Sequence, residues 1–250
     1  MSKRKSESTK KKSSYVSNAY FNCKTGDTGH ILGIDFTKNP EQRELIRLMN
    51  DNNTPYIFCF GDAGTGKTFA AVAATIDLIK VQRRYSKAFY IREPLEVGRS
   101  LGFLPGDLDE KYGPYLEGLE DNLEHISLMT GLNKDDMKHC FECTPPQFTR
   151  GRSFLDSILI IDEAQNLSLD TIRTLMTRLG NYCKMVFIGS TNQIDIKGAT
   201  KEKNDFKTAY EITKAIEPPI VGFVELVKSE RSEYCKIIDN AFAAYYDSKK

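Results

Sequence analysis

One segment of the chain has the residue types and spacing of a phosphate-binding loop. It fits the pattern G-x-x-x-x-G-K-[ST], and its eight residues are Gly61, Asp62, Ala63, Gly64, Thr65, Gly66, Lys67 and Thr68. Glycines let the backbone turn so that successive amides point inward at a polyphosphate. In such a loop the lysine reaches the β- and γ-phosphates, and the last hydroxyl ligates magnesium. We expect the carboxylate of Asp62 to point away from the phosphates.

The elements around this phosphate loop, residues 61–68, support the same interpretation. Residues 56–60 form a short apolar run typical of a buried parallel strand. Apolar residues then recur at helical spacing from Phe69 to Ile79. A helix that begins near Lys67 would direct its partial positive charge at a bound phosphate. The predicted nucleotide-binding residues are therefore the loop and Phe69, and a plain glycine-rich turn is disfavoured.

A second segment supplies two carboxylates at the end of an apolar strand. Residues 158–161 are all aliphatic, and Asp162 and Glu163 follow directly. The first carboxylate of this acid pair would hold Mg²⁺ through its water shell. The second could polarise an attacking water. The alternative is that both residues cap the helix that follows.

A third strand ends in small and polar residues. It runs through Phe187 and Ile188 into a segment that contains Asn192 and Gln193. Either side chain could sense the γ-phosphate, so that hydrolysis changes a hydrogen bond. We select Gln193 as the candidate catalytic residue of this segment. The alternative is that the segment is a plain polar loop.

The remaining pattern indicates the architecture that positions these residues. The strand through Phe187 and Ile188 is predicted over 185–188, and further strands over 87–91 and 220–224; helices begin at Pro40 and after Ser168. A closing helix carries apolar residues from Tyr234 to Tyr245. Residues 92–150 are interpreted as loops and short helices inserted over the sheet edge. Strands that alternate with helices predict an α/β fold with a mainly parallel sheet flanked by helices.

Composition limits the class of protein. The chain has 250 residues, 40% of them hydrophobic, and a net charge of +1. No apolar run reaches the roughly 18 residues that a membrane-spanning helix needs, and the start lacks the apolar core of a secretory signal. These features predict an intracellular, cytoplasmic protein, bacterial or, if viral, in the host cytoplasm.

The amino-terminal segment differs from the rest of the chain. Its first 12 residues contain six basic residues and one acidic residue. We expect residues 1–34 to be a basic, largely disordered arm, followed by a single domain over 35–250. The arm could serve solubility or contact a phosphate backbone.

Several motifs together resemble PhoH-like P-loop ATPases. The resemblance covers about residues 36–246, and the most specific segment is Leu101-Gly102-Phe103-Leu104-Pro105-Gly106-Asp107-Leu108. The phosphate loop resembles the family as well, as do the runs Asp162-Glu163-Ala164-Gln165-Asn166, Arg150-Gly151-Arg152-Ser153, Thr177-Arg178-Leu179-Gly180 and Gln193-Ile194-Asp195. The resemblance implies a RecA-like P-loop NTPase fold, ATP hydrolysis with Mg²⁺, a link to RNA, and assembly into a homo-oligomeric ring such as a hexamer.

The resemblance also implies roles for residues outside the two main motifs. Gln42 matches a glutamine that reads adenine in related helicases, although it could equally complete the cap of its own helix. Arg231 could touch the γ-phosphate, and Arg178 could do so across a subunit boundary. Each arginine could instead form a surface ion pair. Ser190 stands where the family usually has aspartate, which puts the coupling of that strand in doubt.

The function predicted from the sequence is Mg²⁺-dependent ATP hydrolysis coupled to RNA or single-stranded nucleic acid, as in a helicase-like motor or remodeller. The alternative is an ATP-dependent oligomeric switch or scaffold that acts on a protein partner. A small-molecule kinase is disfavoured, because no acceptor site or lid signature is evident. Candidates for nucleic-acid contact, which could instead be solvated loop residues, are Arg92, Arg99, Lys111, Tyr112, Arg150 and Arg152.

Overall fold

The computed structural model describes residues 29–94, 113–149, 151–190 and 204–247. Its main feature is a sheet of six parallel strands in the order β5-β4-β6-β7-β3-β8. The strands are β3 (Tyr56–Gly61), β4 (Lys87–Arg92), β5 (Phe141–Thr144), β6 (Ser157–Asp162), β7 (Lys184–Gly189) and β8 (Val221–Leu226). The predicted mainly parallel α/β fold is confirmed.

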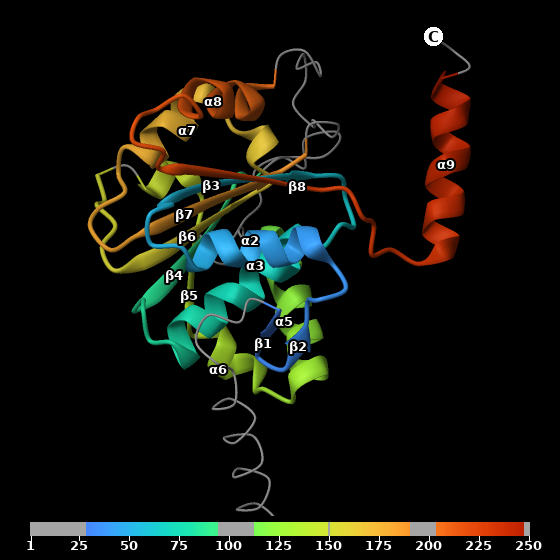
Figure 1. The fold of residues 1–250 in the computed structure, drawn as a ribbon, viewed down its shortest axis with the longest axis horizontal. Coiled ribbons are helices and arrows are strands. Elements are labelled where there is room, and N and C mark those ends of the chain that lie inside the picture. Colours follow the sequence, from blue (N-terminus) through green and yellow to red (C-terminus); the bar gives the residue numbers. More distant parts are fainter. Residues whose placement is uncertain (1–28, 95–112, 150, 191–203, 248–250) are drawn as a thin grey trace, which may run out of the picture.

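Helices cover both faces of this sheet (Figure 1). One face carries α2 (Pro40–Asn50), α3 (Lys67–Ile76) with its π-helical continuation Asp77–Val81, α5 (Glu117–Thr130) and the short α6 (Lys134–Lys138). The other face carries α7 (Leu169–Met176) and α8 (Asp205–Thr213). Alternate residues of each central strand enter the two cores, as Ile57 and Phe58 do in β3. Burial on both faces explains why these strands are continuous apolar runs.

The domain includes residues that the sequence analysis assigned to the amino-terminal arm. β1 (His30–Ile31) and β2 (Ile34–Asp35) form an antiparallel hairpin before α2. Ile31 and Ile34 are buried in the core beside α2 and α3. The predicted boundary between arm and domain at residue 35 is therefore wrong, because these apolar side chains already belong to the domain at residues 29–34.

The inserted region also differs from its prediction. β5 adds a sixth strand at the sheet edge, where it pairs with β4, and α5 is a helix of 14 residues rather than a short one. Two short 3₁₀ helices in the described part of this region are Gly113–Leu116 and Pro146–Thr149. Another 3₁₀ helix, Ala164–Asn166, directly follows the acid pair. The insertion thus extends the sheet and adds a helix beside α3.

The last helix, α9 (Glu233–Asp247), lies apart from the sheet in Figure 1. Its apolar stripe is exposed to solvent and consists of Tyr234, Ile237, Ile238, Phe242 and Tyr245. The predicted helix is present, but its stripe does not close the core. Among the described residues, no helix is long and apolar enough to cross a membrane.

A buried lysine joins the start of β7 to the end of α2. Lys184 is 1% exposed, and its ammonium donates to the carbonyl oxygens of Leu48 at 3.1 Å, Asp51 at 2.7 Å and Thr54 at 2.6 Å. Lys184 thus adds a charged donor to carbonyls at and just after the end of α2, and those of Leu48 and Asp51 also accept backbone N–H groups. Burial lowers the pKa of Lys184 to about 8.

Candidate nucleotide-binding and hydrolysis site

The phosphate loop lies between β3 and α3 and is built on backbone conformations that favour glycine. Gly61, Gly64 and Gly66 all have positive φ angles, of 154°, 79° and 79°. Gly66 is the N-cap of α3, and no side chain caps this helix. The first amides of α3 are therefore available to an anion, and they face the cavity that the loop encloses.

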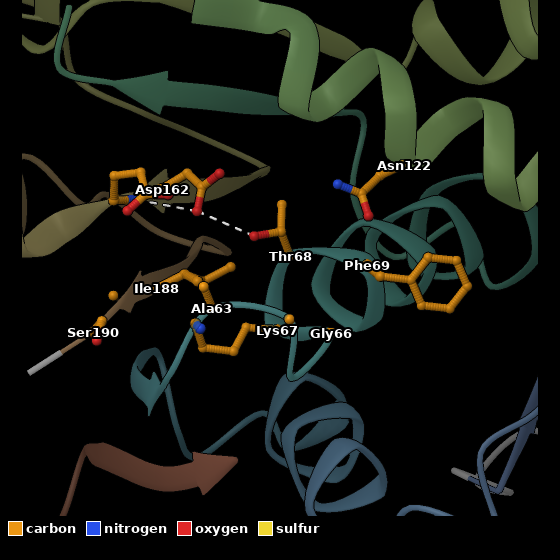
Figure 2. A pocket seen from close by; sticks show the side chains of 12 residues that line it. Ala63, Gly66, Lys67, Thr68, Phe69, Asn122, Asp162, Ile188 and Ser190 are labelled. Carbon is orange, nitrogen blue, oxygen red and sulfur yellow. Dashed lines mark hydrogen bonds between the residues drawn. The ribbon is translucent and has the colours of Figure 1, made fainter. Parts of the chain in front are cut away.

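The cavity has a volume of about 250 Å³ and is lined by residues from four parts of the fold. They are Ala63, Gly64, Gly66, Lys67, Thr68 and Phe69 of the loop and α3, Asn122 of α5, the acid pair, and Ile188, Gly189 and Ser190 at the end of β7. Figure 2 shows Thr68, Asp162 and Lys67 around this space, while the Phe69 ring points away from them. The carboxyl ends of the strands thus form the site, as expected for a parallel α/β sheet.

Lys67 lies over its own loop. Its ammonium donates to the carbonyl oxygens of Gly61 and Asp62, each at 2.8 Å. Burial lowers the pKa of Lys67, while the surrounding thiol and carboxylates oppose that change. The ammonium is thus held at the cavity, where a phosphate oxygen could replace a carbonyl as its acceptor.

The acid pair reaches the loop across β7, which lies between β3 and β6 in the sheet. Thr68 donates its hydroxyl to Asp162 Oδ1 at 3.2 Å (Figure 2), and Glu163 donates its backbone N–H to the same oxygen at 3.1 Å. A hydroxyl and a carboxylate oxygen so close together form the hard oxygen set that suits Mg²⁺. Thr68 and Asp162 therefore fit the ion that the sequence implies.

Glu163 lines the cavity directly after Asp162. Its backbone is left-handed, with φ 51°, and its carboxylate accepts a hydrogen bond from Gln165 Nε2 at 2.5 Å and lies 4.0 Å from the Arg92 guanidinium. Burial raises the pKa of Glu163, and the charge of Asp162 raises it further, against the opposing effects of Gln165, Arg92 and Lys67. A raised pKa makes this carboxylate a stronger base near neutral pH.

The end of β7 contacts both the phosphate loop and the segment that follows the acid pair. Ser190 donates its backbone N–H to Gln165 Oε1 at 3.0 Å, and its hydroxyl contacts Asp62 Oδ1 at 3.3 Å. Asp62 is turned toward Ser190 and does not line the cavity. Gln165 therefore links Glu163 to the end of β7. The sequence motif contains Gln165 but does not predict this contact.

Two residues from outside the loop fix its backbone. Gln42 donates its side-chain amide to Thr65 O at 3.0 Å, and Glu230 donates its backbone N–H to Gly64 O at 2.8 Å. Gln42 does not complete a capping box, since only Asn39 caps α2, by accepting from the Gln42 amide at 3.1 Å. The side chain of Arg231 lies directly against Gly64. Gln42 and Arg231 are thus both brought to the loop.

Other predicted residues lie elsewhere or outside the described part of the chain. Arg178 follows α7 near the amino ends of the strands, opposite the cavity. Arg152 pairs with Glu142 at 2.7 Å and lies over the Phe89 ring. Gln193, Arg99, Lys111, Tyr112 and Arg150 lie outside the described residues.

Two residues near the cavity were not predicted. Asn122 reaches it from α5 (Figure 2), and Tyr90 donates its hydroxyl to Asp162 Oδ2. Burial raises the pKa of Tyr90 well above its usual range, and the charge of Asp162 acts in the same direction. The sequence signal that could have indicated Tyr90 is a phenol hydroxyl within the apolar middle of β4.

The fold and this site define a P-loop protein of the α/β class, in which a glycine-rich loop and an acid pair meet at the carboxyl edge of a parallel sheet. A family model described as PhoH-like protein matches residues 36–243. The chain belongs to the PhoH-like family, as the sequence motifs predicted. Nucleoside-triphosphate binding is the general property of the P-loop class.

Curated relatives agree with this assignment. The chain is 34% identical to "Protein PhoH2" of Bacillus subtilis (strain 168) over 216 residues, covering 82% of this chain and 47% of that protein. It is 36% identical to a "PhoH-like protein" of the same organism over 194 residues, covering 77% of this chain and 58% of the relative. The chain therefore spans about half the length of the curated relatives it matches.

A solved structure also shows a weak similarity. "Structure of unliganded Pif1 from Bacteroides sp" aligns with a TM-score of 0.33 and 14% identity, covering 80% of this chain and 43% of that one. A match at this level supports no conclusion about fold or function.

Proposed function

We propose that this protein binds ATP with Mg²⁺ and hydrolyses the β–γ bond, and that it couples this cycle to single-stranded RNA or DNA. The observation that carries the ATPase proposal is the meeting of Thr68, Asp162 and Glu163 around one cavity. A glycine-rich turn that binds no nucleotide would not need the acid pair, which lies at the end of β6, two strands away from β3 in the sheet.

Each residue of the site has a task in this reaction. The free amides at the start of α3 and the Lys67 ammonium bind phosphate oxygens and offset their charge. Thr68 and Asp162 would hold Mg²⁺, which neutralises charge on the phosphates and orients them when bound. Glu163 orients a water molecule and accepts its proton at a carboxylate oxygen. Arg231, which lies against Gly64, is placed to offset charge on the γ-phosphate.

Loss of the loop lysine should weaken nucleotide binding and reduce turnover together. Lys67→Ala removes the one lysine ammonium that lines the cavity among the described residues, so we expect weak binding and turnover reduced at least about 100-fold. Phosphate release and binding of a fluorescent ATP analogue measure the two effects. Lys207→Ala, which removes an exposed lysine on α8, is the matched control. Wild-type turnover by Lys67→Ala would exclude the proposed site.

The nucleic-acid partner is proposed from the family resemblance and from basic residues near the insertion. Single-stranded RNA should stimulate ATP turnover, and Arg150→Ala combined with Arg152→Ala should remove the stimulation. Salt must be held fixed, because contacts with phosphate backbones weaken steeply as salt rises. Arg173→Ala, at an exposed position of α7, is the control. Turnover that ignores RNA and single-stranded DNA would contradict this half of the proposal.

The second candidate function, an ATP-dependent switch acting on a protein partner, is favoured by the exposed apolar stripe of α9. The segment before α9 contacts the phosphate loop through Glu230 and Gly64. This candidate predicts slow turnover that is indifferent to nucleic acid, and homo-oligomeric ring assembly that depends on ATP.

A further inference from the structure

The inference concerns the phenol that lies beside the acid pair. Tyr90 belongs to β4, is fully buried, and donates its hydroxyl to Asp162 Oδ2. Arg92 and Asp162 are directly paired between β4 and β6. Because alternate residues of a strand share a face, Tyr90 lies on the same face of the sheet as Asp162. The contact is therefore a consequence of the strand register.

The two oxygens of Asp162 have different surroundings. Oδ1 faces the phosphate loop, where Thr68 and the Glu163 amide donate to it. Oδ2 accepts the hydrogen bond from the Tyr90 hydroxyl. Asp162 is only 5% exposed, so solvent offers few competing donors. Together these donors fix the carboxylate plane and direct one oxygen toward the position that Thr68 shares.

The packing above this contact leaves room for the phenol. Gly118 of α5 lies over it, and a side-chain carbon at that position would be 3.8 Å from the Tyr90 hydroxyl and 3.1 Å from an Arg92 nitrogen. The strand itself needs no hydroxyl for its core, since a phenylalanine ring would fill the same volume. The hydroxyl is explained by its polar partners: it donates to Asp162 and also has a hydrogen bond with the Arg92 side chain.

We propose that Tyr90 is a positioning residue that orients the Asp162 carboxylate for the Mg²⁺ of bound Mg-ATP. This inference rests on the proposed function of the site. Hydrogen bonds from an outer shell commonly orient carboxylates that hold a metal, and their removal typically lowers metal affinity 10- to 100-fold. Tyr90 acts through Asp162 and touches neither nucleotide nor metal.

The test measures nucleotide binding rather than turnover. A fluorescent, non-hydrolysable ATP analogue is bound to wild type and to Tyr90→Phe while Mg²⁺ is titrated, and binding is also measured in EDTA. We expect the Mg²⁺ concentration at half-maximal binding to rise about tenfold or more in Tyr90→Phe. Binding without Mg²⁺ should equal that of wild type, because the phosphate loop is unchanged.

A matched control separates this role from loss of a hydroxyl in general. Tyr56 donates its hydroxyl to Met176 O at 2.9 Å, near the amino ends of the strands and away from the cavity. Tyr56→Phe should keep the wild-type Mg²⁺ requirement, whatever its effect on unfolding by denaturant. In the background of Asp162→Asn, Tyr90→Phe should add no further shift, because its acceptor carboxylate is already lost.

The outcomes distinguish this inference from the proposed function. A wild-type Mg²⁺ requirement in Tyr90→Phe, or a further shift in the Asp162→Asn background, overturns the positioning role while ATP binding by the wild type stands. If wild type binds the analogue with no dependence on Mg²⁺, the role of Tyr90 and the proposed metal site both fail.

Discussion

Glu163→Gln is expected to bind ATP and to lose turnover by about 10²- to 10⁴-fold, the usual contribution of a positioned general base. The amide has nearly the same shape as the carboxylate and keeps an oxygen that can accept from Gln165. It cannot accept a proton from water. The phosphate loop, Thr68 and Asp162 remain, so binding should change little.

Two measurements check this expectation. Single-turnover phosphate release reports the chemical step, and binding of a fluorescent ATP analogue reports the phosphate loop. Glu44→Gln is the control, because Glu44 is exposed on α2 and pairs only locally with Arg47 in the described structure. Turnover by Glu163→Gln within a few-fold of wild type would remove Glu163 from the reaction, whereas loss of binding would assign it to the binding site.

Lys184→Met should destabilise the fold by roughly 2–4 kcal/mol without changing the nucleotide site. The variant removes the ammonium that donates to three carbonyl oxygens at and just after the end of α2, and loss of a charged donor to such acceptors is costly. Equilibrium unfolding in denaturant measures the loss. Lys207→Met, at an exposed lysine, should change stability by less than about 0.5 kcal/mol.

The same lysine predicts a pH dependence. Its pKa is about 8 in the folded protein, below the 10.5 of an unperturbed lysine. Between these two values the unfolded chain binds more protons, so the stability contributed by Lys184 rises with pH through this window. Below pH 8 this contribution is at its lowest. The stability difference between wild type and Lys184→Met should therefore widen from pH 8 to 10, and a constant or shrinking difference would contradict the burial effect.

Much of the fold could be predicted because its central strands are buried on both faces. Residues 56–60 and 158–161 are continuous apolar runs, and each lies within an observed strand. β5 could not be predicted in this way, since its residues Phe141–Thr144 are mostly half-buried at the sheet edge and include Glu142. The hairpin at residues 30–35 is too short to show a strand periodicity.

The candidate site also has parts that the sequence could predict and parts that it could not. The phosphate loop and acid pair are local in sequence, so their residue types alone predicted them. Contacts that depend on strand order were not accessible: β7 separates β3 from β6, and only this order brings Ser190 between Asp62 and Gln165. The Tyr90 contact similarly depends on the register of β4 against β6.

The hydrogen bond between Ser190 and Asp62 has a consequence for sequence variation. An aspartate at position 190 would set two negative charges side by side at the mouth of the loop, and like charges at this range repel. Substitution at either position therefore changes what the other can tolerate. The neutral Ser190 hydroxyl, which donates to the loop carboxylate, avoids this repulsion.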